Sequence, residues 1–222
     1  MKKILARGGI EFLAVFLGIG LSFYVEQWQT EKDEIELLKV DCKNILSDIA
    51  EDIITINNII DKNQKILGAG RKIISMVIEP ASIDLDSLNK QARKLGFPTF
   101  YGITRSYKLS YSTGRLNLFA DTDLIKEISK LYDHYYERLN INSDVYDKVG
   151  LDFFNSFLHR NIGYTRDVPN FDKNEILKFY SSKLFISEIG IFNRRVSFYL
   201  ARLSETNNQL LIVKKQLEQY LS

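Results

Sequence analysis

The sequence predicts an all-α protein, in which an N-terminal transmembrane helix continues into a long stalk helix that lies antiparallel to a long C-terminal helix, with a small helical bundle at the distal end. Apolar residues recur at three- and four-residue steps over long stretches near both ends of the chain. Only 3 prolines, the residues that most sharply terminate helices, occur in 222 residues. No sustained alternation of apolar and polar residues appears, so we expect no β-sheet.

The composition excludes several functional classes. With 45% apolar and 26% charged residues, the chain has the balance of a folded domain. Its 30 basic and 28 acidic residues form no basic face, so we expect no nucleic-acid partner. One cysteine, Cys42, and two histidines, His134 and His159, exclude an internal disulfide and the usual zinc sites. No phosphate-loop, metalloprotease or nucleophile-elbow motif occurs, so we expect no enzyme, no catalytic residue, no metal and no cofactor.

An uncharged apolar run, FLAVFLGIGLSFYV, occupies residues 12–25. As a helix these residues extend about 21 Å, whereas a bilayer crossing needs about 20 residues. Residues from Ile4 onward supply the remainder if Arg7 and Glu11 lie at the membrane interface. We therefore predict a transmembrane anchor here.

The charges beside the apolar run predict its orientation. Lys2, Lys3 and Arg7 precede it, and acidic residues dominate the stretch that follows. The positive-inside rule then places the N-terminus in the cytoplasm and the helical domain in the periplasm, at a bacterial inner membrane. A helical domain in the cytoplasm is the alternative. A cleaved signal peptide fits less well, because no small-residue cleavage site follows the run; a buried or surface-lying amphipathic helix is a further alternative to a span.

One face of the anchor carries Glu11, Ala14, Gly18 and Ser22, which are spaced by three, four and four residues. Small residues in such a stripe let two helices approach closely in lipid. One interpretation is self-association, with Glu11 buried against a partner helix. The other is that small residues are common in membrane helices and that Glu11 reaches the lipid headgroups.

Two long amphipathic helices flank the middle of the chain. The apolar stripe of the first consists of Ile35, Leu38, Cys42, Ile45, Ile49, Ile53 and Ile60. The stripe of the second consists of Ile189, Phe192, Val196, Tyr199, Leu203, Thr206, Leu210, Val213, Leu217 and Tyr220. Such a regular repeat makes a coiled-coil-like seam, which can close within one chain or between chains. Cys42 is expected to be a small buried side chain in this seam and not a nucleophile.

The middle section is predicted to contain several short helices. Gly68, Ala69 and Gly70 are expected to open a turn that ends the stalk helix. The helices that follow are expected at residues 71–78, 86–95 with Asp86 as its cap, 99–109, 124–139 capped by Asp121 or Thr122, 143–160 and 173–180, with a tight turn at residues 112–114.

The predicted organisation has five segments. They are a short cytoplasmic tail (1–9), the transmembrane anchor (10–28), the long stalk helix (29–68), a central helical bundle (69–183) and a long C-terminal helix packing on the stalk (184–222). In this arrangement the C-terminus returns close to the membrane, beside the anchor.

Two stretches of the chain, EFLAVFLGIGLSFYVEQWQTEK and SYKLSYSTGRLNLFADTDLIKEISKLYDHYY, carry a resemblance. They resemble a family of uncharacterised, single-pass membrane-anchored helical proteins of Bacteroidota, which share a glutamate before a Gly-Ile membrane core and a Ser-Gly-Leu turn before a capped helix ending in Tyr-Tyr. The matching residues are Glu11, Gly18, Ile19, Gly114, Leu116, Leu124, Ile128 and Tyr135. Thr113, inserted between Ser112 and Gly114, departs from the pattern. The resemblance implies a location and an architecture, but no activity.

Basic and aromatic residues gather on both sides of the turn at residues 112–114. The candidates are Arg105, Tyr107, Tyr111 and Arg115, with Tyr135 on the helix that follows. If the two flanking helices pack as a hairpin, these residues would line a pocket for an anionic or aromatic ligand. The alternative is that the rings fill a small helical core.

These observations together predict a non-enzymatic, membrane-tethered helical interaction or scaffold protein that self-associates through its anchor. Its expected partners are the lipid bilayer and either further copies of itself or another membrane protein. One alternative is an oligomeric pore-forming effector with Glu11 facing a polar lumen. Another is an extracytoplasmic ligand-sensing module that acts through a partner.

Overall fold

The computed structural model describes residues 2–78, 84–118, 122–162 and 172–222, with only the backbone described for residues 2–14, 122, 156 and 162. These residues form helices and connecting loops, with no strand among them, which confirms the all-α prediction. The helices are α1 (Lys2–Ile78), α2 (Leu85–Ala92), α3 (Arg105–Ser112), a 3-10 turn (Arg115–Leu118), α4 (Thr122–Ser129), a π-helical segment (Lys130–Tyr136), α5 (Glu137–Leu151), a second π-helical segment (Asp152–Leu158), α6 (His159–Ile162), α7 (Lys173–Tyr180) and α8 (Lys183–Leu221).

Helix α1 runs without a break for 77 residues, which corresponds to about 115 Å. The turn predicted at residues 68–70 is therefore wrong, because glycine permits a turn but does not require one. At Gly70 the glycine serves close packing: an added Cβ would lie 1.9 Å from Oδ1 of Asn193 on α8. At Gly68 an added Cβ would meet nothing within 4 Å.

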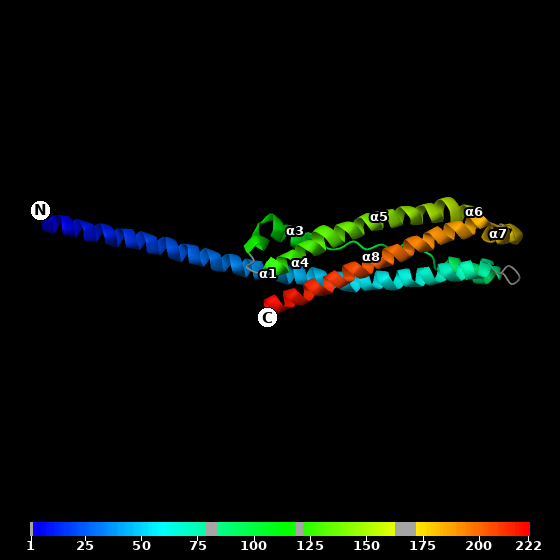
Figure 1. Cartoon of the computed structure of the whole chain (residues 1–222), viewed down its shortest axis with the longest axis horizontal. Helices are drawn as coiled ribbons and strands as arrows, with labels where there is room; N and C mark the ends of the chain where they lie inside the picture. Colours follow the sequence, from blue (N-terminus) through cyan, green and yellow to red (C-terminus); the bar gives the residue numbers. More distant parts are fainter. Residues whose placement is uncertain (1, 79–83, 119–121, 163–171) are drawn as a thin grey trace.

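Helices α1 and α8 pack together in antiparallel directions (Figure 1). Gly70 of α1 faces Asn193 of α8, and Nδ2 of Asn207 on α8 donates a hydrogen bond of 3.0 Å to Oδ1 of Asn57 on α1. The residue numbers on α8 therefore increase as those of their partners on α1 decrease. The buried residues of the predicted α8 stripe are Ile189, Phe192, Val196, Tyr199, Leu203, Thr206, Leu210, Val213 and Leu217. The seam is therefore confirmed, and it closes within one chain.

The predicted α1 stripe is buried at Leu38, Cys42, Ile45 and Ile49, whereas Ile53 and Ile60 are only partly buried. Ile35 is 47% exposed, because it precedes Cys42, near which α8 ends. Burial, together with the charge of Asp41, raises the pKa of the Cys42 thiol to about 12. Cys42 therefore stays protonated and fills space in the seam, as predicted.

The middle section does not form a small bundle at the far end of the stalk. Helices α4 and α5 and the π-helical segment between them pack on α8 as a third layer (Figure 1). The separate helices predicted at 124–139 and 143–160 are parts of this one rod, since no proline interrupts it. Thr122, predicted as a possible cap, is instead the first residue of α4, and Asp121, the other predicted cap, lies outside the described residues.

The C-terminus does not reach the end of the predicted anchor. Helix α8 ends near Asp41 and Cys42, so α1 projects alone beyond the bundle (Figure 1). About 24 Å of helix separates Val25 from Asp41. The predicted return of the C-terminus to a position beside the anchor is therefore wrong, because α8 has 39 residues and α1 has 77.

Residues 95–104 form an extended segment, which we call the strap, so the helix predicted at 99–109 is wrong in its first half. Helix α3 begins only at Arg105. Helix α2 is capped by Asp84, whose carboxylate accepts from the backbone N–H groups of Asp86 and Ser87, and not by Asp86. The predicted turn after α3 is confirmed, with Gly114 at φ 74°.

The two glycines of α1 should respond in opposite directions to alanine. Gly68→Ala should raise the free energy of unfolding by about 1 kcal/mol, because alanine favours a helix and the site is open. Gly70→Ala should lower it by about 1–3 kcal/mol, because the buried carboxamide of Asn193 must move. Urea denaturation of both variants measures the difference, and equal shifts would contradict the packing of α8 at Gly70.

Candidate functional site

The part of α1 beyond the bundle exposes large apolar side chains around its whole circumference. They are Val15, Phe16, Leu17, Ile19, Leu21, Phe23, Tyr24, Val25 and Trp28, each more than half exposed. On the face predicted for self-association, Gly18 has open space around it, and Oγ of Ser22 donates to the Gly18 carbonyl at 2.9 Å. The side chains of Glu11 and Ala14 lie outside the described part. Within the described residues, no helix has the length and hydropathy that a membrane crossing requires.

The two arginines predicted to line a pocket are held by carboxylates of α1. Nε and Nη2 of Arg115 donate to the two carboxylate oxygens of Asp41 at 2.6 and 3.3 Å. Nε of Arg105, whose side chain is 81% exposed, lies 3.6 Å from Oδ1 of Asp48. Both guanidinium charges therefore have a partner inside the fold.

The predicted tyrosines divide between a buried stack and the surface. Tyr107 stacks on Tyr132 with ring centroids 4.2 Å apart, and its hydroxyl donates to Asp133 at 2.9 Å. Tyr107 also lines a cavity of about 180 Å³, but Arg105, Tyr111, Arg115 and Tyr135 do not. This cavity is below the range of about 300–1,000 Å³ that is usual for small-molecule sites.

Tyr111 and Tyr135 stand apart from that cavity. Tyr111 is exposed beside the ring of Tyr107, with centroids 5.8 Å apart. Tyr135 is partly buried against the core and meets His134 edge to face. The rings of this region thus mainly fill the core, which was the alternative to a ligand pocket.

The strap has no regular hydrogen-bonding pattern, and side chains of α1 supply part of what it lacks. Oδ2 of Asp52 accepts from the backbone N–H of Ile103 at 2.9 Å. Nδ2 of Asn63 donates to the carbonyl of Pro98 at 3.0 Å. Buried backbone groups need such partners, so these side chains determine where the strap lies.

Helices α5 and α8 hold the opposite side of the strap. The hydroxyl of Tyr199 accepts from the backbone N–H of Phe100 at 2.8 Å. Oγ of Ser143 donates to the Phe100 carbonyl at 3.3 Å and lies 3.0 Å from the Tyr199 hydroxyl. The hydroxyl of Tyr146 donates to the Gly96 carbonyl at 3.3 Å. Three helices are therefore connected through one extended segment.

Three buried carboxylates on α1, at Asp41, Asp48 and Asp52, were missed by our reasoning from the sequence. Each is at most 6% exposed. Their signal was present: they are spaced by seven and four residues, on the side of the helix that carries the apolar stripe. Aspartates are rarely buried without a partner, and no local pattern reveals the partners of these three.

Asp52 has a raised pKa. Burial raises its pKa from 3.8 to about 6, and the negative charges of Asp48 and Glu51 add to the effect. Hydrogen bonds from the hydroxyl of Tyr136 and the backbone of Ile103 favour the charged form and partly offset it. A raised pKa means that this carboxyl contributes more stability below about pH 4 than above about pH 6.

Asp52→Asn should remove this pH dependence. Asparagine keeps an oxygen that can accept from Tyr136 and Ile103, so the fold should survive. The difference in the free energy of unfolding, wild type minus variant, should fall by on the order of 2–3 kcal/mol between pH 4 and pH 6.5. Urea denaturation across that range measures it. Asp52→Ala, which leaves both donors unpaired, should destabilise at every pH, and a difference independent of pH for Asp52→Asn would contradict the assignment.

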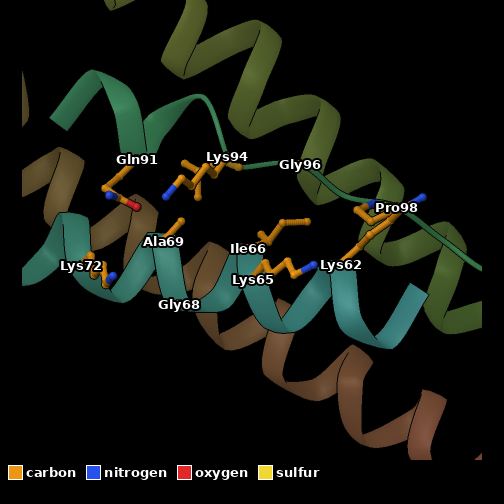
Figure 2. A pocket seen from close by; sticks show the side chains of 11 residues that line it. Lys62, Lys65, Ile66, Gly68, Ala69, Lys72, Gln91, Lys94, Gly96 and Pro98 are labelled. Atoms are coloured by element: carbon orange, nitrogen blue, oxygen red, sulfur yellow. The ribbon is translucent and has the colours of Figure 1, made fainter. Parts of the chain in front are cut away.

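A larger cavity, which we call the basic pocket, lies between α1 and the region of α2 and the strap (Figure 2). Its volume is about 680 Å³. Its lining residues are Lys62, Lys65, Ile66, Gly68, Ala69, Lys72, Gln91, Lys94, Leu95, Gly96 and Pro98. Figure 2 shows Ile66 and Ala69 pointing from α1 into the space below Lys94 and Gly96. Lysines around an aliphatic floor can bind an anion attached to an apolar group.

The basic pocket was not predicted from the sequence. We assigned Gly68, Ala69 and Gly70 to a turn, and this placed Lys72 on a different element from Lys62 and Lys65. The available signal was the local charge: residues 62–94 contain seven basic and three acidic side chains.

The fold and its sites define an elongated, antiparallel helical bundle with a single projecting helix and a basic pocket. The model of a family of unknown function (DUF6090) matches residues 11–158, and the chain belongs to this family. No curated protein and no solved structure matches the chain significantly. The predicted membership in a family without known activity is thereby confirmed; the bacterial group and the membrane anchor stay predictions.

Proposed function

We propose that the protein is a non-enzymatic interaction or scaffold protein, tethered to a membrane by the N-terminal part of α1. The observation that carries this proposal is the all-round exposure of apolar side chains at residues 15–25. A helix that is apolar on every side needs a non-aqueous environment or a covering partner. The bundle cannot supply the cover, because it begins only near Asp41.

The residues around the apolar run support an interfacial boundary at its end. Trp28, the only tryptophan, follows the run, and Nζ of Lys32 lies 4.1 Å from the centroid of its ring. Aromatic and basic side chains of this kind are typical of a membrane–water interface. Acidic residues dominate the next turns, so the proposed orientation keeps the N-terminus in the cytoplasm of a bacterium and the bundle in the periplasm.

The non-enzymatic part of the proposal is supported by how the buried polar groups are used. The Asp52 carboxylate accepts from Tyr136 and Ile103, and the Asp41 carboxylate accepts from Arg115. The hydroxyls of Tyr199 and Tyr146 hold the strap. These groups are therefore occupied in positioning the fold, and a general base needs a free path to a substrate proton.

Membrane tethering predicts that charges within the apolar run release the protein. The full-length chain should float with phospholipid vesicles, and its Trp28 emission should shift to shorter wavelength. Leu17→Asp with Leu21→Asp should abolish both effects, because each aspartate costs about 2.5–3.5 kcal/mol inside a bilayer. Ile54→Asp, at a 74% exposed position on the bundle, is the matched control and should float like the wild type.

The same helical content and melting temperature in all three proteins would show that only the anchor is affected. If the double variant floats as well as the wild type, or the wild type does not float, the tether is disproved.

Self-association through the anchor predicts a difference between two glycines. Gly18 lies in the stripe with Ala14 and Ser22, whereas Gly20 lies about 200° around the helix. Neither has a neighbour within 4 Å inside the chain. Gly18→Leu should convert an oligomer into a monomer in mild detergent, because leucine keeps the helix backbones apart, and Gly20→Leu should not. Light scattering of the purified proteins measures the mass; equal masses for both variants would contradict the stripe as the contact.

A further inference from the structure

The lysines of the basic pocket have no anionic partner within the described chain. Among the described residues, the side-chain ammonium groups of Lys62, Lys65, Lys72 and Lys94 form no ion pair or hydrogen bond. Other surface lysines do pair, as Lys126 does with Asp123 at 3.2 Å and Lys214 with Glu218 at 3.6 Å. Residues 62–94 carry a net charge of +4, from seven basic and three acidic residues. Four like charges around one cavity attract an anion.

The floor of the pocket is aliphatic. Ile66, Ala69, Leu95 and Pro98 line it, and no aromatic ring does, although the chain contains 14 phenylalanines and 12 tyrosines. A flat aromatic ligand would lack stacking partners here, whereas a flexible aliphatic chain would be covered on one side by similar groups. The volume of about 680 Å³ lies within the usual range for small-molecule sites.

Gly68 keeps the α1 wall of the pocket free of a side chain. Glycine inside a helix costs about 1 kcal/mol relative to alanine. At Gly70 the approach of Asn193 explains the glycine, but at Gly68 no neighbour within 4 Å does. A larger side chain at Gly68 would extend along the wall. From Lys62 to Lys72 the wall is about 15 Å long.

We propose that the basic pocket binds an anionic amphiphile with a single aliphatic chain. The chain lies on the floor formed by Ile66, Ala69 and Leu95, and a carboxylate or phosphate headgroup pairs with the lysines at the rim. Lysine suits either headgroup, because it acts as a mobile point charge with three donors. The inference goes beyond the proposed function and does not depend on it, since the pocket is lined by residues 62–72 and 91–98 and not by the projecting part of α1.

Hydrogen exchange read by mass spectrometry tests the proposal on the full chain in nanodiscs of zwitterionic phospholipid. The probes are decanoate and decyl phosphate, with decanol, decyltrimethylammonium and inorganic phosphate as controls. Both anionic amphiphiles should slow exchange in the peptides that contain residues 62–72 and 88–98, and leave those of residues 200–217 unchanged. Gly68→Leu should abolish this protection while melting no lower than the wild type, because the site is open and leucine favours a helix.

Charge variants inside and outside the pocket give the comparison: Lys65 lies on α1, Lys94 follows α2 and Lys90 lies within α2. Lys94→Gln, in the pocket, together with Lys65→Gln should weaken binding of decyl phosphate at least tenfold, whereas Lys90→Gln, exposed and outside the lining, should leave it unchanged. Protection by decanol or decyltrimethylammonium equal to that by the anions would reduce the pocket to an apolar surface and overturn the proposal. Protection by inorganic phosphate alone would also overturn it, by showing a simple anion site. The proposal would likewise be overturned if neither anionic amphiphile gave protection, or if Gly68→Leu were protected as fully as the wild type.

Discussion

The strap is the constraint on which the rest of the bundle depends. An extended segment inside a helical protein has no partners of its own for its backbone N–H and C=O groups, and burying them unpaired is costly. Around Phe100 the partners come from Tyr199 on α8 and Ser143 on α5. Two residues earlier in the strap, Asn63 on α1 donates to the Pro98 carbonyl and accepts a hydrogen bond from the hydroxyl of Tyr146. Each of the three helices can satisfy the strap in only one register. The apolar stripes alone would tolerate sliding by a heptad, so the polar contacts specify which alignment is adopted.

Fixing the alignment through polar contacts requires the burial of carboxylates, which is energetically unfavourable. Asp48 and Asp52 lie one helical turn apart, both are nearly inaccessible, and the pKa of Asp52 is raised mainly by its burial. Apolar residues at these places would pack without that cost, but they could not accept from Ser106 or Ile103. Replacing buried polar groups by apolar ones is often neutral or stabilising for the fold as a whole, and their established use is in fixing alignment. Two glycines permit close packing around the strap: an added Cβ at Gly102 would lie 2.1 Å from the ring of Tyr136, and one at Gly150 would lie 2.3 Å from Phe97.

Features set by neighbouring residues could be predicted from the sequence, whereas features set by partners distant in the sequence could not. The α8 seam was predictable residue by residue, because its period is a local property that tertiary contacts then reinforce. The strap was not, since its extended form depends on partners that are distant in the sequence, such as Ser143 and Tyr199. The continuity of α1 was not predicted for the same reason. Gly70 locally indicates a turn, and only the close approach of Asn193 on α8 explains a glycine inside a helix at this position. The aspartates that pair with Arg105 and Arg115 lie on α1, beyond the reach of any local pattern.

The charge along α1 changes sign between the proposed membrane tether and the basic pocket. Residues 26–61 contain ten acidic and three basic side chains, and the basic pocket begins immediately after them, so the sign of the charge reverses along one continuous helix. About 60 Å of helix separates Val25 from Lys65, and the pocket is therefore held far from the surface at which the proposed tether would end. The pocket also shares residues with the strap: Gly96 and Pro98 line it, and their carbonyls accept the hydrogen bonds of Tyr146 and Asn63. A ligand in the pocket would thus contact the segment that sets the alignment of α1, α5 and α8. A bound ligand can change the alignment of the helices only if it binds one arrangement of the strap more tightly than another. Gly96 and Pro98 are the residues through which ligand binding would affect that alignment.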